Sequence, residues 1–166
     1  MNINLRELAS KEAPVELHGR LDLKEAVSGR NDIRLKEPIT ASLRVRSESG
    51  TAIVAGTLTA DLELTCAKCL KKVDERVEFP VTEMFTMQPG VAERDEDIHL
   101  VQDEIVELTP YLQDAFIVQL PMAAVCSQQC KGLCPVCGND RNAGSCDCVQ
   151  DQIDPRLAGL KDFFKS

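Results

Sequence analysis

The chain has 166 residues, with 19 basic and 27 acidic side chains and a formal net charge of −8. This length suits one domain. The acidic charge argues against a protein that binds nucleic acid with its whole surface, because such binding needs cations that neutralise phosphates. With five Phe, one Tyr and no Trp, the core has to consist mainly of Val, Leu, Ile and Ala.

The first ninety residues are predicted to form an antiparallel β-sheet. Apolar and polar residues alternate, as in strands with one wet face, in the segments 15–23, 39–46, 57–65 and 73–87. Pro80 indicates that the last of these is an edge strand, because proline cannot donate to a neighbouring strand. The simplest topology is a meander whose second hairpin carries Cys66 and Cys69 at its tip.

One packed helix is predicted after an irregular, acidic connection over residues 88–103. It covers residues 109–120, with Thr109 as its N-cap and Pro110 at the first helical position, where a missing N–H costs nothing. Pro121 marks its end. Its apolar face consists of Leu112, Ala115, Phe116 and Leu120. We expect this face to pack across the sheet and the chain to return from there to the hairpin tip.

A second helix start lies near the C-terminus, where Asp154 provides a cap and Pro155 a first helical residue. We therefore divide the chain into a β-rich domain over residues 1–125 and a cysteine-rich zinc segment over residues 126–166 that ends in a short helix. The predicted fold class is α+β, an antiparallel meander with one packed helix and a C-terminal zinc-binding segment.

Two regions of the chain carry unbalanced charge. Residues 93–107 hold seven acids against one base, a net charge of −6, and a solvated loop is the simplest reading of such a run. Lys68, Lys71 and Lys72 surround the first cysteine pair with no acid among them. These lysines either offset the negative charge of thiolates or, together with Lys131, contact RNA.

Eight cysteines form the strongest motif, because they make two sets of four, the number of ligands that a tetrahedral zinc ion takes. They are Cys66, Cys69, Cys126, Cys130, Cys134, Cys137, Cys146 and Cys148. Two pairs have the spacing Cys-x-x-Cys, in which a tight turn (here called a knuckle) aims both sulfurs at one metal. Gly138, directly after the second pair, permits the positive φ that such a turn often needs.

Short spacings favour the last four cysteines as one zinc site, since small loops cost little entropy to close. The upstream knuckle then joins the pair that follows the helix in a second zinc site. A competing division would join Cys126 and Cys130 to Cys134 and Cys137.

The cellular compartment separates metal ligands from disulfides. The first residues contain no apolar run long enough for a signal peptide, and no segment approaches the ~18 apolar residues that span a bilayer. We therefore expect a cytoplasmic protein, in which thiols stay reduced and clustered cysteines bind metal. A thioredoxin-like pair should open a helix after a strand, whereas Cys66 ends one strand and the next begins soon after Cys69.

The cysteines belong to a longer pattern between residues 62 and 160. Its parts are Cys66-Ala67-Lys68-Cys69-Leu70, Pro121-Met122, Cys126, Cys130-Lys131-Gly132-Leu133-Cys134-Pro135, Cys137-Gly138, Cys146-Asp147-Cys148 and Asp154-Pro155-Arg156-Leu157. This pattern resembles the YceD family, also called large ribosomal RNA subunit accumulation proteins. The resemblance implies a bacterial-type cytosolic protein linked to the build-up of large-subunit ribosomal RNA. The family usually reads Gly-x-Asn-Leu-Asn after the second knuckle, and here Arg141 replaces the apolar residue.

The expected function is that of a zinc-stabilised, non-catalytic factor in ribosome assembly. If all eight thiols bind metal, no open position is left for water or substrate, and only His18 and His99, far apart in the sequence, are available for other catalysis. The expected partner is a pre-large-subunit ribosomal particle, which the protein would bind through the particle's RNA or through a basic ribosomal protein. The alternatives are a metal-stabilised protein-interaction module without RNA contact and a thiol-redox enzyme, which the sequence disfavours.

Overall fold

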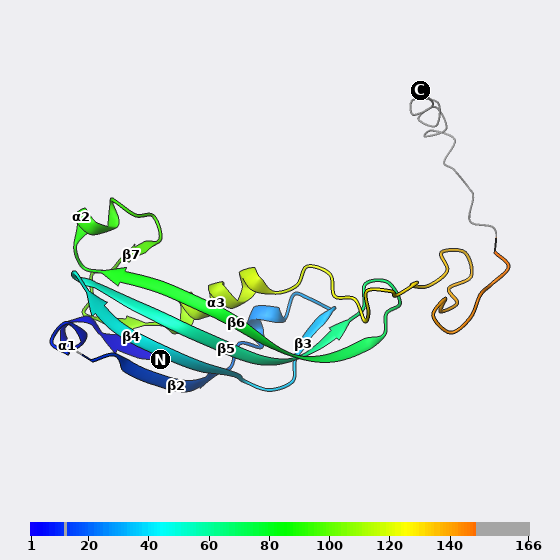
Figure 1. Ribbon diagram of the computed structural model, residues 1–166, viewed down its shortest axis with the longest axis horizontal. Coiled ribbons are helices and arrows are strands. Elements are labelled where there is room, and N and C mark those ends of the chain that lie inside the picture. The colour runs from blue at the N-terminus through cyan, green and yellow to red at the C-terminus, as the bar shows by residue number, and fades with distance from the viewer. Residues whose placement is uncertain (12, 149–166) are drawn as a thin grey trace, which may run out of the picture.

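The computed structural model describes residues 1–11 and 13–148. Its main element is a sheet in the order β2-β4-β5-β6-β7, with β3 beside β5 (Figure 1). The strands are β2 (Val15–Leu21), β3 (Ile33–Leu35), β4 (Ile39–Glu48), β5 (Thr51–Thr65), β6 (Lys72–Thr86) and β7 (Ile98–Leu100). The α+β class is confirmed. The purely antiparallel meander is wrong at β7, which runs parallel to β6.

A long hairpin of β5 and β6 dominates the sheet. The two strands pair along their whole length, from Thr51 opposite Thr86 to Thr65 opposite Lys72. Each strand has 15 residues, and at ~3.3 Å per residue the hairpin is about 50 Å long. Because β7 pairs only with the last residues of β6, most of β6 is an edge, as Pro80 predicted.

The acidic connection is not irregular throughout, contrary to the sequence prediction. It contains α2 (Pro89–Ala92) and the strand β7, which pairs with residues 84–86. A strand of three residues is too short to show a period of two, so the sequence had no signal for it. The connection lies at the end of the hairpin opposite its tip (Figure 1).

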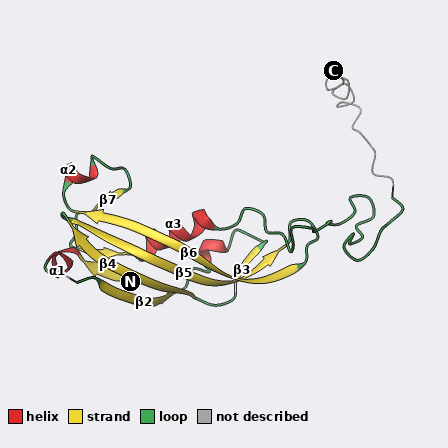
Figure 2. Ribbon diagram, viewed as in Figure 1, coloured by secondary structure: helices red, strands yellow, loops and turns green. Residues whose placement is uncertain are grey.

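The helix α3 (Thr109–Gln119) packs on the sheet, as predicted (Figures 1 and 2). Its N-cap is Leu108 and not Thr109, whose hydroxyl oxygen instead accepts a hydrogen bond of 3.2 Å from the Met1 amino group. Phe116 is fully buried and meets Phe79 of β6 edge to face, with the ring centroids 5.0 Å apart. The apolar face of α3 therefore closes the main core.

The chain also forms a second, two-stranded sheet, which the sequence did not predict. Strand β1 (Asn2–Asn4) pairs antiparallel with β8 (Ile105–Glu107), and α1 (Leu5–Ala9) follows β1 directly. A single 3-10 turn, η1 (Glu25–Val27), precedes β3. Within the described residues, no helix is long and apolar enough to cross a membrane. The short helix predicted from Asp154 lies outside the described residues.

Beyond α3 the chain runs to the hairpin tip as loops. From residue 120 to residue 148 the described structure contains no helix or strand, apart from one bridge between Leu133 and Asp140 (Figure 2). Buried cysteines form a small cluster there, separate from the main core. This segment is therefore held by loop contacts, several of them to the hairpin tip, and not by an extension of the sheet.

Candidate metal centre

The first knuckle closes the tip of the β5–β6 hairpin. The backbone N–H of Cys66 donates to the Lys71 oxygen at 2.9 Å, and the N–H of Leu70 donates to the Cys66 oxygen at 2.9 Å. This turn places Leu70 at φ +60°, which is uncommon for a residue other than glycine. Two paired strands thus hold the turn that carries Cys66 and Cys69.

The second knuckle repeats this geometry. The N–H of Cys134 donates to the Asn139 oxygen and the N–H of Gly138 donates to the Cys134 oxygen, both at 2.8 Å. Gly138 has φ +74°, as the sequence predicted. The two knuckles therefore share the same pair of backbone hydrogen bonds, although only the second has glycine at the strained position.

Four thiols from two distant segments meet at the hairpin tip. The sulfurs of Cys66 and Cys130 are 3.9 Å apart, those of Cys69 and Cys126 are 3.6 Å apart, and all four lie within 4.8 Å of one another. Four sulfurs at about 2.3 Å from a tetrahedral zinc ion are about 3.8 Å apart. This group, called here the first quartet, has the spacing that a four-thiolate metal site requires.

The other four thiols form a second quartet, made of Cys134, Cys137, Cys146 and Cys148. These sulfurs also lie within 4.8 Å of one another. Cys134 is buried whereas Cys137 is exposed, so this quartet is closer to solvent than the first. The thiols group as the short spacings favoured and not as in the competing division. That they bind a metal stays a prediction.

The first cysteine of each knuckle favours the thiolate form. Backbone hydrogen bonds from Cys126 and Cys69 lower the pKa of Cys66 to about 6. A backbone hydrogen bond from Cys137 is the largest of the effects that lower the pKa of Cys134 to about 6. The pKa of Cys130 is lowered as well. Because the thiolate is the form that binds metal, each quartet has at least one member prepared for a cation.

The crowded thiols resist further ionisation. A hydrogen bond with Cys130 raises the pKa of Cys126 to about 12, and one with Cys137 raises the pKa of Cys148 to about 12. Neighbouring thiolates repel each other in the absence of a cation. A divalent metal ion offsets this repulsion and releases the protons as it binds, so both quartets suit such an ion.

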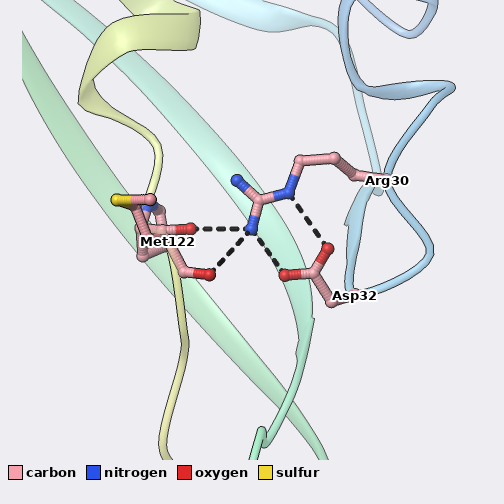
Figure 3. A network of polar contacts seen from close by, with 4 residues as sticks. Arg30, Asp32 and Met122 are labelled. Atoms are coloured by element: carbon pink, nitrogen blue, oxygen red, sulfur yellow. Dashed lines mark hydrogen bonds and ion pairs between the residues drawn. The ribbon is translucent and has the colours of Figure 1, made fainter.

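Arg30 holds the segment that leads from α3 to the first quartet, and sequence reasoning missed this role (Figure 3). Its Nη2 donates to the backbone oxygens of Pro121 at 2.8 Å and Met122 at 3.4 Å, and its Nε donates to Asp32 Oδ1 at 3.0 Å. A backbone N–H of the first knuckle donates to the Ala124 oxygen at 2.8 Å. These contacts guide the segment to Cys126.

A glycine allows the two cysteine segments to approach each other. The N–H of Leu133 donates to the Lys68 oxygen at 2.9 Å. Gly132 has φ +72°, and a Cβ there would lie only 2.9 Å from the Lys68 oxygen. Because a larger residue would push the segments apart, Gly132 positions the chain between the quartets beside the first knuckle.

Asn142 contacts the first quartet from the loop of the second, and sequence reasoning missed it as well. Its Nδ2 donates to Cys130 Sγ at 3.5 Å, and its Oδ1 accepts from the N–H of Lys131 at 2.8 Å. Asp140 fixes the amide, since its Oδ1 accepts from Asn142 Nδ2 at 2.7 Å and from Asn142 N at 2.9 Å. The only sequence signal was the final Asn of the family pattern.

The neighbouring Arg141, where the family usually has an apolar residue, is half-buried. Its N–H donates to the Gly132 oxygen at 3.0 Å. The backbone path of the knuckle therefore accommodates the change of side chain.

The four predicted RNA-contact lysines lie near the hairpin tip and are exposed. They are Lys68, Lys71, Lys72 and Lys131. Lys72 forms an ion pair of 2.7 Å with Glu63. The acidic stretch 93–107 lies at the opposite end of the hairpin, roughly 40 Å away if β6 is measured from Lys72 to Met84. The two charged regions are therefore separate surfaces.

Neither histidine lies with the cysteines. His99 Nε2 is 2.8 Å from Glu83 Oε2 at the acidic end of the sheet, and His18 is an exposed residue of β2. Both metal candidates are therefore built from sulfur alone.

Comparison with known proteins places these features in a family. The profile described as large ribosomal RNA subunit accumulation protein YceD matches residues 54–164. The uncharacterised protein YlbN of Bacillus subtilis is 28% identical over 151 residues, which are 90% of this chain and 88% of that protein. An uncharacterised protein of Mycobacterium bovis is 36% identical over 125 residues, 74% of this chain and 60% of that protein.

A Zea mays protein named large ribosomal RNA subunit accumulation protein YCED homolog 1, chloroplastic, is 32% identical over 73 residues, 43% of this chain and 25% of that protein. No solved structure matches the chain significantly. The profile match covers more than half of the chain, and it includes both knuckles and all eight cysteines. The chain therefore belongs to the YceD family.

Proposed function

We propose that this protein is a zinc-stabilised, non-catalytic factor that supports the accumulation of large-subunit ribosomal RNA and thereby ribosome assembly. The observation that carries the proposal is the pair of four-thiol clusters in a chain of a family described by ribosomal RNA accumulation. Four sulfur ligands complete the tetrahedral shell of zinc, so neither site offers a position for water or substrate.

The role of zinc in this proposal is structural. An ion in the first quartet joins the hairpin tip to a segment more than fifty residues away in the sequence. An ion in the second quartet organises residues 134–148, where the described chain has little buried apolar surface of its own. Zinc binding supplies folding free energy in small domains that lack a sufficient core.

The shape of the molecule suits a large partner. A basic hairpin tip and an acidic segment lie at opposite ends of a sheet about 50 Å long (Figure 1). The lysines complement RNA phosphates, and the acidic segment complements a basic ribosomal protein. A pre-large-subunit particle in the cytoplasm contains both RNA and protein and so offers both kinds of surface.

Co-sedimentation tests this proposal. The zinc-loaded protein should travel with pre-large-subunit particles in a sucrose gradient, and its deletion should reduce the amount of large-subunit ribosomal RNA. Ribonuclease treatment should release the protein if RNA is the direct partner. If the protein stays in the ribosome-free fractions and deletion leaves ribosomal RNA unchanged, the proposed function is wrong.

A second candidate is a metal-stabilised protein-interaction module without RNA contact. It is favoured by the ion pair of Lys72 with Glu63 and by the position of the lysines beside thiols whose charge they offset. Charge reversal at Lys71 and Lys72, with zinc content shown to be intact, separates the two. Unchanged association with the particle would favour the interaction module. In that case, neutralisation of Asp95, Glu96 and Asp97 should abolish the association.

A thiol-redox enzyme is the remaining alternative. It requires that the knuckle cysteines exchange with disulfides, so it predicts cysteines that are free of metal in the purified protein. Stoichiometric zinc, retained after treatment with a mild oxidant, would exclude it.

A further inference from the structure

A cleft of about 730 Å³ lies beside the hairpin tip, between the loop around η1, strand β3 and the ends of β5 and β6. Its lining includes five cations, which are Lys24, Arg30, Arg34, Lys36 and Lys72, and two acids, which are Asp32 and Glu63. We propose that this cleft binds the phosphodiester backbone of a single-stranded RNA segment. This inference rests on the proposed function and adds a surface that the cysteine motifs did not indicate.

Four of the five cations are available for phosphate. Lys24 and Arg34 form no ion pair with any residue that the structure describes. Lys36 pairs with Asp74 at 2.9 Å and Lys72 with Glu63, but both lysine side chains remain exposed, and ion pairs near the surface contribute little stability. A phosphate therefore competes well for both lysines.

Arg30 has a different role in the cleft, because its Nε and Nη2 already donate to Asp32 and to the backbone after α3 (Figure 3). The Arg30–Asp32 pair is neutral overall and fixes one wall of the cleft. The positive charge that faces a ligand therefore comes from the other four cations.

The remaining lining points to backbone contact and not to base recognition. No aromatic side chain is among the described residues that line the cleft, so bases have no stacking platform there. Ser28, Asn31 and Thr65 add neutral hydrogen-bonding groups of the kind that bind phosphate and sugar. The volume is that of a small-molecule pocket, about 300–1000 Å³, which suits a few nucleotides of one strand.

The acidic stretch 93–107 is too distant to cancel this local field. The acidic stretch is roughly 40 Å from the cleft along β6, whereas the Debye length at physiological salt is about 8 Å. Lys72 also lies next to the first knuckle, whose Lys68 and Lys71 are exposed. Lys72 thus belongs both to the cleft and to the group of lysines around the first knuckle.

Salt dependence of RNA binding tests the inference. Fluorescence anisotropy of the zinc-loaded full chain with a labelled oligouridine should show log K falling with log salt with a slope of about −0.7 per phosphate contact. Four contacts predict a slope near −2.8, so affinity should fall about 50-fold between 50 and 200 mM salt. Lys24→Ala with Arg34→Ala should reduce the slope to about −1.4 and the fall to about 7-fold.

The matched control is Arg44→Ala with Arg46→Ala, which removes the same charge from exposed positions at the other end of β4. The control should bind as the unmodified chain does. An oligouridine and an oligocytidine of equal length should bind equally, because the contacts are to the backbone.

Any of three results would refute the proposal that RNA binds in the cleft. Lys24→Ala with Arg34→Ala could leave affinity and slope unchanged while Lys68→Ala with Lys71→Ala abolishes binding, which places the RNA on the knuckle alone. The control variant could lose as much RNA affinity as the cleft variant does, which would show that RNA is attracted by the net charge of the protein and not by the cleft. The chain could fail to bind oligouridine yet co-sediment with pre-large-subunit particles after ribonuclease treatment, in which case the proposed function stands without the cleft.

Discussion

Replacing Asn142 by alanine should weaken metal binding at the first quartet although Asn142 is not itself a ligand. The substitution removes the hydrogen bond to Cys130 Sγ at 3.5 Å and the acceptor for the N–H of Lys131 at 2.8 Å. Residues that orient metal ligands in this way typically change metal affinity 10- to 100-fold when they are substituted. We therefore expect a loss of about 1.4–2.7 kcal/mol in zinc binding at the first quartet.

The measurement is a competition for zinc between the protein and a chromophoric chelator. Such a titration gives a separate dissociation constant for each of two zinc ions when the two sites differ in affinity. Asn142→Ala should weaken one ion by the stated factor and leave the other within about 3-fold. The matched control is Asn139→Ala, since Asn139 is exposed and contributes only its backbone oxygen to the second knuckle. The reasoning fails if Asn142→Ala weakens neither ion, or if Asn139→Ala has the same effect.

The position of Asn142 also predicts coupling between the quartets. It lies between Cys137 and Cys146, in a loop that an ion bound to the second quartet would close. Opening that quartet with Cys146→Ser should free the loop and lower the affinity of the first quartet. In that background Asn142→Ala should add little, because the amide is already released. Strictly additive losses in the double variant would contradict the coupling.

Three further predictions concern metal content and stability. Metal analysis at saturating zinc should return two zinc ions per chain and one in Cys146→Ser, because each quartet has four thiols of its own. Fewer than two in the unmodified chain, or none in the variant, would contradict this. Chelation should expose the amides of residues 126–148 to hydrogen exchange before those of β5, because the segment has no helix or strand to hold it; unchanged protection there would show folding without metal. Phe116→Ala should lower the free energy of unfolding, measured by chemical denaturation, by about 3–5 kcal/mol, because its ring is fully buried. Val118→Ala, at an 84% exposed position, should change the free energy of unfolding by no more than about 0.5 kcal/mol.

Local patterns in the sequence were sufficient for the long strands β2, β4, β5 and β6, the helix α3 and the knuckles. The alternation over residues 39–46 reappears as alternating burial along β4, and Pro121 ends α3 as expected. These features depend on neighbours within a few residues, which the sequence displays directly. Gly138 adopts the positive φ of its turn for the same reason. The family resemblance rested on the same short motifs.

Contacts between distant segments were decided only by the tertiary structure. Cys69 meets Cys126 across 57 positions, and spacing alone could favour this division of the cysteines but not exclude its competitor. Arg30 reaches the backbone of Pro121 across 91 positions. No periodicity or short motif reports such a pairing, because it depends on how the sheet, α3 and the loops pack together.

The basic cleft shows the same limit. Its walls come from residues 24–36, 63–65 and 72, which pairing of β3 with β5 and of β5 with β6 brings together. In the sequence these cations are scattered among acids and the chain is acidic overall. Electrostatic attraction depends on distance in space, so the sequence alone determined which charges the protein has, and only the fold decided which of them act together.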